Sequence, residues 1–146
     1  MSNFDRHLYS HNHIKGCWEH HVEWCPKYRF NALLGEEIKG DCEAILQSIA
    51  IERNWEILEL AVMTDHIHLI LRTHQPMNPS EIIFHLKGRS AYELFKKHPE
   101  LRNQYWGGHL WSRGSFIRNI GVDIETERRY VREHYDIRQT SLKQWA

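Results

Sequence analysis

Met63-Thr-Asp-His-Ile-His-Leu-Ile-Leu-Arg72 has the pattern of a short turn followed by a β-strand. Because successive side chains of a strand point to opposite faces, His66 and His68 share one face and the apolar residues around them take the other. Two imidazoles about 7 Å apart on a rigid strand can form a platform for a divalent metal. A polar strand face without a metal is the alternative interpretation.

A second motif, Asp123-Ile-Glu-Thr-Glu-Arg-Arg-Tyr-Val-Arg-Glu-His134, is typical of a helix. It follows Gly121, begins with an Asp that can cap it, and lacks Gly and Pro. Tyr130 and His134 are four residues apart and therefore lie on one face of this helix. A metal held by His134 could polarise a phosphate while Tyr130 attacks it. The alternative is a solvated helix with an incidental tyrosine.

Size and composition favour a single domain over residues 1–146, because 146 residues can bury a substantial core. The six tryptophans argue against disorder. Apolar runs fall well short of the roughly 20 residues of a membrane span, so we expect no membrane association. The three cysteines lack CxxC spacing and are interpreted as reduced thiols of a cytoplasmic protein, neither a disulfide framework nor a zinc ribbon.

The formal net charge is zero, which counts against a strongly basic nucleic-acid binder. The charges are unevenly distributed, however. Acidic residues concentrate between positions 36 and 59, whereas arginines gather in the last third of the chain. A basic face can therefore exist on a neutral protein.

The order of expected elements predicts the fold. Hydrophobic periodicity and turn signals give strands at about 18–25, 55–63, 66–72 and 111–118, and helices at about 36–54, 79–98 and 123–134. Asn78 is a candidate cap and Pro79 suits a first helical position. The resulting βαββαβ order is typical of an α+β, ferredoxin-like antiparallel sheet with helices on one face, here followed by a C-terminal helix carrying Tyr130. The core spans about 18–135, and 136–146 is a polar tail.

Five short blocks together resemble a known family. Read with residue numbers, they are Trp24-Cys-Pro-Lys-Tyr-Arg29, Asp65-His-Ile-His-Leu69, Leu86-Lys-Gly-Arg-Ser90, Leu110-Trp-Ser-Arg113 and Arg129-Tyr130. In this order and spacing they resemble the single-tyrosine transposases of the insertion-sequence 200/605 family. These are HUH enzymes, named for histidine–hydrophobe–histidine. The resemblance runs from about residue 18 to 134.

The resemblance implies a homodimer that cleaves and rejoins single-stranded DNA with a divalent metal and no ATP. His66 and His68 match the HUH ligands, and Tyr130 matches the nucleophile that forms a 5′-phosphotyrosine bond. His134 stands where family members commonly carry glutamine as a third ligand. An all-imidazole site favours manganese more than an amide-containing one, and we expect Mg²⁺ or Mn²⁺. In relatives the tyrosine helix docks on the partner's HUH strand, so active sites shared between subunits are expected.

Relatives bind an imperfect DNA hairpin near each end of their element. For a DNA-binding protein of this kind, we expect a cytoplasmic, nucleoid-associated location. Tyr28 or Trp111 could stack on bases, although a place in the core is the favoured interpretation of the aromatics. The candidate phosphate contacts are Lys87, Arg89, Arg113 and Arg118.

Three other interpretations remain open. Another HUH enzyme, such as a replication or relaxation nickase, would use the same chemistry, usually in a larger domain. A domesticated protein could bind single-stranded hairpins, or nick them, without transposition. A histidine-rich metal-binding module would leave the spacing of Tyr130 and His134 unexplained.

Overall fold

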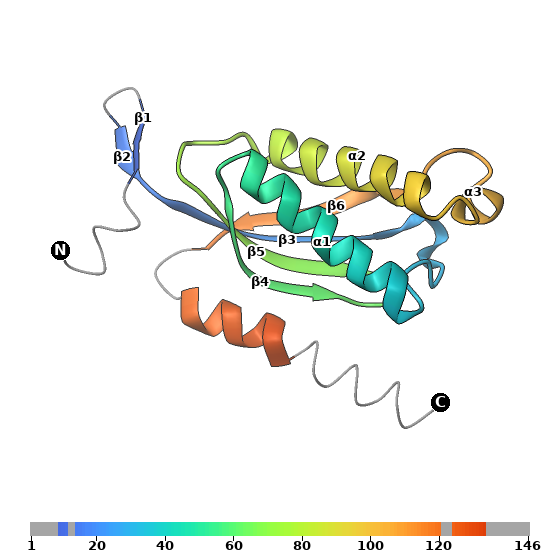
Figure 1. The fold of residues 1–146 in the computed structure, drawn as a ribbon. Coiled ribbons are helices and arrows are strands. Elements are labelled where there is room, and N and C mark those ends of the chain that lie inside the picture. The colour runs from blue at the N-terminus through green and yellow to red at the C-terminus, as the bar shows by residue number, and fades with distance from the viewer. Residues whose placement is uncertain (1–8, 12–13, 121–123, 134–146) are drawn as a thin grey trace.

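The computed structural model describes residues 9–11, 14–120 and 124–133. Its central sheet has the order β4-β5-β3-β6, and all neighbouring strands are antiparallel. Helices α1 and α2 pack together on one face of this sheet (Figure 1). The arrangement confirms the predicted ferredoxin-like βαββαβ fold. Its elements are β3 (Trp18–Pro26), α1 (Glu36–Glu52), β4 (Glu56–Val62), β5 (Ile67–Thr73), α2 (Pro79–Lys97) and β6 (Trp111–Asn119).

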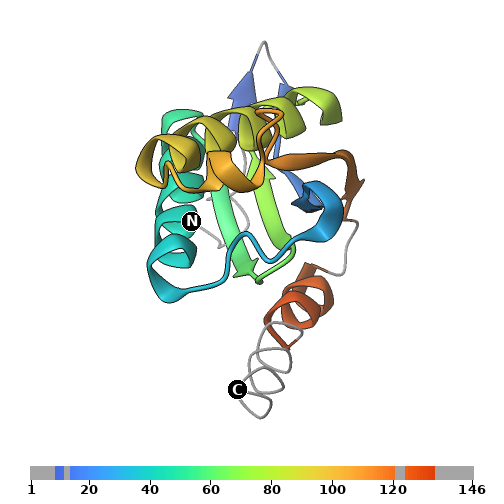
Figure 2. The ribbon, with the colours of Figure 1, turned by 90° about the vertical axis from the view of Figure 1, so that its right-hand side faces the viewer.

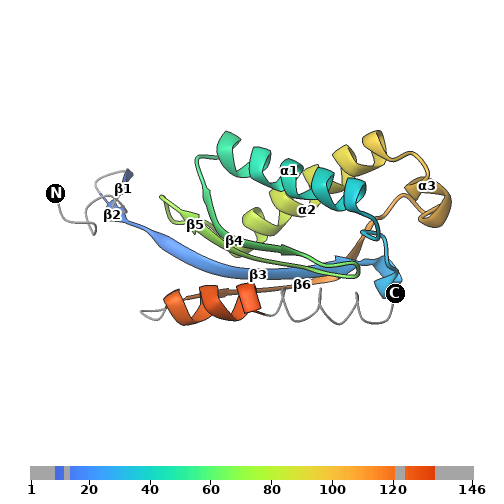
Figure 3. The ribbon, with the colours of Figure 1, turned by 60° about the horizontal axis from the view of Figure 1, so that its bottom comes forward.

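Several further elements complete the described part of the chain. A helix over residues 124–133, called the C-terminal helix below, lies against the sheet face opposite α1 and α2 (Figure 3). Sequence patterns did not predict the small hairpin of β1 (Tyr9–His11) and β2 (Ile14–Gly16) or the short helix α3 (Leu101–Gln104). Gly121, Asp123, His134 and the tail 136–146 lie outside the described residues. Within the described ranges, helices are too short or too polar to cross a bilayer.

The two faces of the sheet carry different side chains because strand residues alternate. Val22 of β3 and Leu69 of β5 pack in the main core beneath α1 and α2. Their neighbours His21 and His68 point to the opposite face, which the C-terminal helix partly covers. Strand β5 is consequently buried along its whole length. The sequence pattern correctly separated an apolar face from a histidine face, although β5 begins at Ile67, so that His66 belongs to the turn before it.

Helix α2 follows its sequence signals closely. The Asn78 side chain accepts a hydrogen bond from the Ser80 backbone N–H at 2.9 Å, which satisfies one of the unpaired amides at the helix start. The Trp111 indole donates to the Ser90 hydroxyl at 3.0 Å, so Trp111 is a core residue and is unsuited to stacking on DNA. Ile82 is fully buried in the first turns of this helix, and Ile83 packs partly buried at the edge of the core.

Helix α1 ends earlier than predicted. The pattern indicated a helix to residue 54, but α1 ends at Glu52. Arg53 caps it, and Asn54 has a φ of 59°, in the left-handed region that stops a helix. Trp55, which follows the end of the helix, is buried in the core.

His20 predicts a pH dependence of stability. It is buried on the helical side of β3, with Nε2 3.3 Å from the Thr73 hydroxyl, and burial lowers its pKa. The imidazole of His20 therefore binds a proton more tightly in the unfolded chain than in the folded one. The free energy of unfolding is unaffected by His20 above about pH 6.5 and falls as the pH drops below that value. Denaturant unfolding at about pH 7.5 and pH 5.5 should therefore show a smaller loss for His20→Gln than for wild type. An equal loss would mean that His20 does not contribute.

Candidate active site

Histidines from two adjacent strands meet on the sheet face that carries the C-terminal helix. His68 lies in β5, and its cross-strand partner in β3 is Glu23. His21 stands two residues before Glu23 and therefore shares its face. The ring centroids of His66 and His68 are 4.7 Å apart, and those of His68 and His21 are 5.6 Å apart. Three imidazoles and one carboxylate thus form a continuous polar group on this face.

The chemistry of this group suits a divalent cation. Among the described residues, His21, Glu23 and His68 each offer a ligand atom, and these atoms lie within 4.8 Å of one another. His68 Nδ1 is 3.4 Å from both His21 Nε2 and Glu23 Oε2. Imidazole nitrogen and carboxylate oxygen are donors for first-row divalent metals, so the side chains present fit such an ion. This observation supports a metal centre without identifying the ion.

His66 is held by its neighbour Asp65. The two side chains are 2.8 Å apart, from His66 Nδ1 to Asp65 Oδ1. A carboxylate that accepts from Nδ1 fixes the tautomer whose lone pair is on Nε2, as is common for metal-binding histidines. The prediction that His66, His68 and His134 are the ligands stays a prediction, because His134 lies outside the described residues.

Sequence reasoning missed His21 and Glu23. Burial is the main cause that lowers the pKa of His21; the nearby Glu23 carboxylate raises it and the Arg118 guanidinium lowers it. The net effect favours the neutral imidazole, which is the form that binds metals. The signal was the alternation in His-His-Val-Glu of β3, which places two donors on one face. Their meeting with His68, however, depends on how β3 and β5 are paired.

Tyr130 lies beside this group of histidine and glutamate side chains. It extends from the C-terminal helix, is 53% exposed, and its ring centroid lies 6.3 Å from that of His21. A cavity of about 380 Å³ lies between this helix and the sheet. Its lining residues are His21, Glu23, Phe116, Arg118, Thr126, Glu127 and Tyr130. Tyr130 therefore lines the same cavity as two candidate metal donors, His21 and Glu23.

Apolar contacts help to hold the C-terminal helix on its own sheet. Val131 is buried against Ala61, Met63 and Ile70, and Ile124 is packed at the edge of this small cluster. The cluster is separate from the main core under α1 and α2. Burying a side chain such as Val131 stabilises the packed helix by about 1.5–3 kcal/mol. A few such contacts are enough to hold the helix on the sheet.

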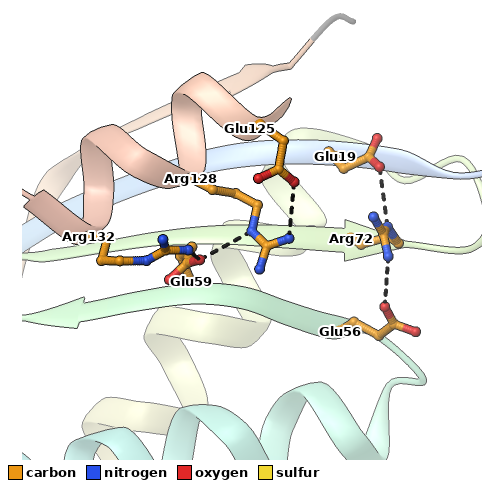
Figure 4. A network of polar contacts seen from close by, with 7 residues as sticks. All are labelled: Glu19, Glu56, Glu59, Arg72, Glu125, Arg128 and Arg132. Carbon is orange, nitrogen blue, oxygen red and sulfur yellow. Dashed lines mark hydrogen bonds and ion pairs between the residues drawn. The ribbon is translucent and has the colours of Figure 1, made fainter. Parts of the chain in front are cut away.

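Polar contacts flank this apolar cluster (Figure 4). Glu59 of β4 pairs with Arg128, at 3.2 Å, and with Arg132. Glu127 lies 3.3 Å from His21 and pairs with Arg118. The C-terminal helix therefore connects to β4 on one side and to β3 and β6 on the other. Because Glu127 contacts His21, the position of this helix is linked directly to the candidate metal donors.

The same face contains a second ion-pair group farther along the sheet. Arg72 of β5 bridges Glu19 of β3, at 3.2 Å, and Glu56 of β4, at 3.1 Å (Figure 4). Arg72 is buried, whereas Glu56 is half-exposed. A buried guanidinium needs such partners, so we interpret this group as structural.

The four predicted phosphate contacts occupy different places. Arg118 borders the Tyr130 cavity, and Arg113 is exposed on β6. Lys87 donates to the Ser112 carbonyl at 2.6 Å, connecting α2 to β6, and burial lowers its pKa. Arg89 lies on the helical layer, where it forms two hydrogen bonds to Glu52, at 2.8 and 3.0 Å. Arg118 is therefore the member of this set that lies beside the candidate nucleophile.

Comparisons with known proteins agree with this geometry. The family model described as Transposase IS200 like matches residues 15–134. The ISDra2 transposase TnpA of Deinococcus radiodurans is 33% identical over 119 residues, which cover 81% of this chain and 84% of that protein. The transposase for insertion sequence element IS200 of Salmonella typhimurium is 27% identical over 124 residues, covering 85% of this chain and 81% of that protein.

Two solved structures are also similar. One is a protein of Deinococcus radiodurans R1 proposed to be a transposase, with a TM-score of 0.69 and 27% identity, covering 86% of this chain and 95% of that one. The other is a REP-associated tyrosine transposase bound to a REP hairpin, with a TM-score of 0.56 and 16% identity, covering 84% of this chain and 67% of that one; this likeness concerns the fold. With the family match over residues 15–134 and a 33% identical relative, the chain belongs to the IS200-like transposase family.

Proposed function

We propose that this protein is a metal-dependent transposase that cleaves and rejoins single-stranded DNA with Tyr130 as its nucleophile. The observation that carries the proposal is the cavity that Tyr130 shares with His21 and Glu23, next to His68. A tyrosine beside a cluster of metal-binding side chains is suited to attack on a phosphodiester. Membership of the IS200-like transposase family supports the same chemistry.

The reaction is a transesterification. The Tyr130 oxygen loses its proton and forms a bond to phosphorus, while the bond from phosphorus to the 3′-oxygen of the DNA breaks. The 3′-oxygen takes up a proton and leaves as a hydroxyl, and the 5′ end stays attached to the protein as a phosphotyrosine. A 3′-hydroxyl of the same or another strand reverses these steps and releases Tyr130. Each step exchanges one phosphoester bond for another, so joining needs no ATP.

We propose His66, His68 and His134 as metal ligands, with His21 and Glu23 as further donors on the sheet. When bound, a divalent ion supplies Lewis-acid stabilisation of the charge on the phosphate oxygens. A tyrosine has a pKa near 10, so its hydroxyl is a poor nucleophile at neutral pH unless it is positioned well. The C-terminal helix supplies that positioning. Mg²⁺ and Mn²⁺ are the proposed ions. A site rich in imidazole favours Mn²⁺ over Mg²⁺.

The proposed substrate is a single strand that carries a hairpin near the end of a mobile element. Support comes from the structurally similar REP-associated transposase, which is described as bound to a REP hairpin. We also propose a homodimer in the cytoplasm, associated with the nucleoid. Family resemblance suggests that the tyrosine helix exchanges between subunits. In this chain the described part of that helix rests on its own sheet, held in part by Glu59 and Glu127.

Comparing two arginines tests where the DNA lies. Arg118→Ala is expected to weaken hairpin binding and to reduce the slope of log K against log salt by about one, because one phosphate contact is lost. The sequence also predicts a phosphate contact for Arg89, but Arg89 lies on α2, on the sheet face opposite the C-terminal helix. Fluorescence anisotropy at several salt concentrations measures both. An unaltered slope for Arg89→Ala would place Arg89 away from the DNA; an unaltered slope for Arg118→Ala would contradict a DNA path past Tyr130.

A cleavage assay tests the proposed function. The protein is incubated with Mn²⁺ and a hairpin oligonucleotide that has unpaired flanks, without any nucleotide cofactor. We expect release of a fragment with a 3′-hydroxyl, joining to a second strand when one is supplied, and loss of both activities with EDTA. Tight hairpin binding without cleavage would instead favour a domesticated DNA-binding protein. Cleavage to a free 5′-phosphate without joining would contradict a tyrosine intermediate.

A further inference from the structure

An exposed aromatic cluster lies at the end of the sheet where β3 ends. Tyr28 belongs to the 3-10 turn η2 (Lys27–Arg29), Phe30 follows it, and Trp106 lies in the loop after α3. The turn and α3 lie at the same end of the molecule (Figures 1 and 2). Tyr28 is 66% exposed and Trp106 is 88% exposed. Aromatic side chains this exposed leave much apolar area in water, and several close together indicate a binding surface.

The exposed aromatic cluster packs against a buried aromatic ring. The rings of Tyr28 and Phe30 are 5.3 Å apart, and Phe30 lies 5.8 Å from the ring of Tyr105, which is buried. Tyr28 has a φ of 64° and Arg29 a φ of 53°. Left-handed backbone is costly for residues other than glycine and is concentrated at functional sites. The chain therefore accepts strain at the turn from which the Tyr28 ring extends into solvent.

Cationic and polar groups surround the rings. The Lys27 ammonium lies 5.2 Å from the centroid of the Tyr28 ring, in a cation–π contact. Tyr28, Trp106 and His109 line a small cavity of about 40 Å³ together with Lys27. Tyr105 lines it too, and its buried hydroxyl has no hydrogen-bond partner among the described residues. Aromatic faces combined with positive charge match a ligand with flat rings and a negative backbone, which describes a nucleic-acid strand.

The cluster continues into the candidate active site through Arg29. The Arg29 guanidinium is 3.5 Å from Asp65, and Asp65 is in turn 2.8 Å from His66. Arg29 and His66 also line one cavity of about 300 Å³. This cavity lies next to the turn that carries Tyr28, so a strand that leaves the site near His66 can follow Arg29 to the exposed rings.

We infer that Tyr28, Phe30 and Trp106 form a stacking platform for unpaired bases of the DNA strand that runs from the active site. The inference rests on the proposed function and adds a base-binding site to it. Bases in a duplex hide their faces against one another, whereas unpaired bases offer theirs to aromatic side chains. The platform therefore selects single strands without reading a particular sequence.

A binding experiment with labelled (dT)12 tests the platform. Fluorescence anisotropy is expected to show binding weakened about fivefold to a hundredfold by Tyr28→Ala and by Trp106→Ala, because each removes one stacking surface. Trp106→Phe should bind within about threefold of wild type, because it keeps an aromatic ring. The tryptophan fluorescence of wild type should be quenched on binding, and Trp106→Phe should lose most of that quenching. The matched controls Phe84→Ala and Tyr92→Ala, which replace exposed aromatics of α2, should bind like wild type.

A blunt hairpin, whose only unpaired bases are those of its loop, separates stacking of the flanking strand from phosphate contact. The platform variants should bind this hairpin like wild type; an equal loss on both probes would overturn the inference. Unchanged (dT)12 binding by both alanine variants would also overturn it, leave the proposed function intact, and point to a protein partner for this surface. If wild type bound neither probe, the proposed function itself would fail, and the platform with it. Thermal unfolding of each variant verifies that the fold is retained.

Discussion

Tyr130→Phe is expected to abolish DNA strand cleavage while leaving hairpin binding and metal binding close to wild type. The substitution removes one oxygen, the proposed nucleophile, and keeps the ring that lies 6.3 Å from His21. Loss of a nucleophile lowers a rate by at least about a thousandfold, because the phenyl ring that remains cannot form a bond to phosphorus. Single-turnover cleavage of a labelled hairpin strand, with binding measured on the same strand, separates the two effects.

The matched control is Tyr92→Phe, which removes a hydroxyl from an exposed tyrosine of α2 on the other side of the sheet. It should cleave at the wild-type rate. Cleavage by Tyr130→Phe at more than about a tenth of the wild-type rate would remove Tyr130 as the nucleophile. Equal loss of binding and cleavage would instead mean that Tyr130 acts in holding DNA.

His68→Ala is expected to have the second largest effect. His68 stands between His66 and His21, and its Nδ1 lies 3.4 Å from the donor atoms of both His21 and Glu23. His68 belongs both to the ligand set implied by the family resemblance and to the cluster that it forms with His21 and Glu23. Its removal should weaken Mn²⁺ binding by at least about a hundredfold and slow cleavage to a similar degree at limiting metal. Calorimetric titration with Mn²⁺, followed by cleavage over a range of metal concentrations, measures both quantities.

His85→Ala provides the control, because His85 is a partly exposed histidine of α2 on the helical layer. Unchanged Mn²⁺ affinity in His68→Ala would exclude the proposed centre. Parallel titrations of His21→Ala and His134→Ala then define the ligand set. A loss for His134→Ala supports the ligand predicted from the resemblance, and a loss for His21→Ala supports the cluster on the sheet.

The fold was predictable because its signals are local. The alternation in β5 separates a histidine face from an apolar one, and Asn78 and Pro79 mark the start of α2. Both features depend on residues that are neighbours in sequence. The order of strands and helices then leaves few topologies, of which the ferredoxin-like sheet is one. The boundary of α1 was less accurate, because Glu52-Arg-Asn54 contains no glycine or proline that marks the end of the helix.

The full set of side chains at the site could not be read from the sequence. His21 and Glu23 become candidates once β3 pairs with β5 in the register that sets Glu23 opposite His68. A one-residue shift in the register of β3 against β5 would turn His21 and Glu23 to the face that packs under α1 and α2. The position of Tyr130 beside His21 likewise requires the C-terminal helix to pack below the sheet rather than beside α1 and α2.

The aromatic cluster illustrates the same limit. Tyr28 and Trp106 are far apart in the sequence, and either alone is compatible with a place in the core. The left-handed turn at Tyr28 and the loop after α3 bring both rings to one exposed surface. The sequence marked Tyr28 and Trp111 as candidates for base stacking but favoured a place in the core. That place is confirmed for Trp111, which is buried and bonded to Ser90, and is wrong for Tyr28, which is exposed.

The covalent intermediate is the most direct test of tyrosine transesterification. Wild type and Tyr130→Phe are each incubated with Mn²⁺ and a single strand that carries a hairpin and unpaired flanks. The products are separated on a denaturing gel and digested for mass spectrometry. We predict a DNA–protein adduct with wild type alone, with the nucleotide attached to the peptide that contains Tyr130. An adduct on another residue, or cleavage without any adduct, would contradict the mechanism.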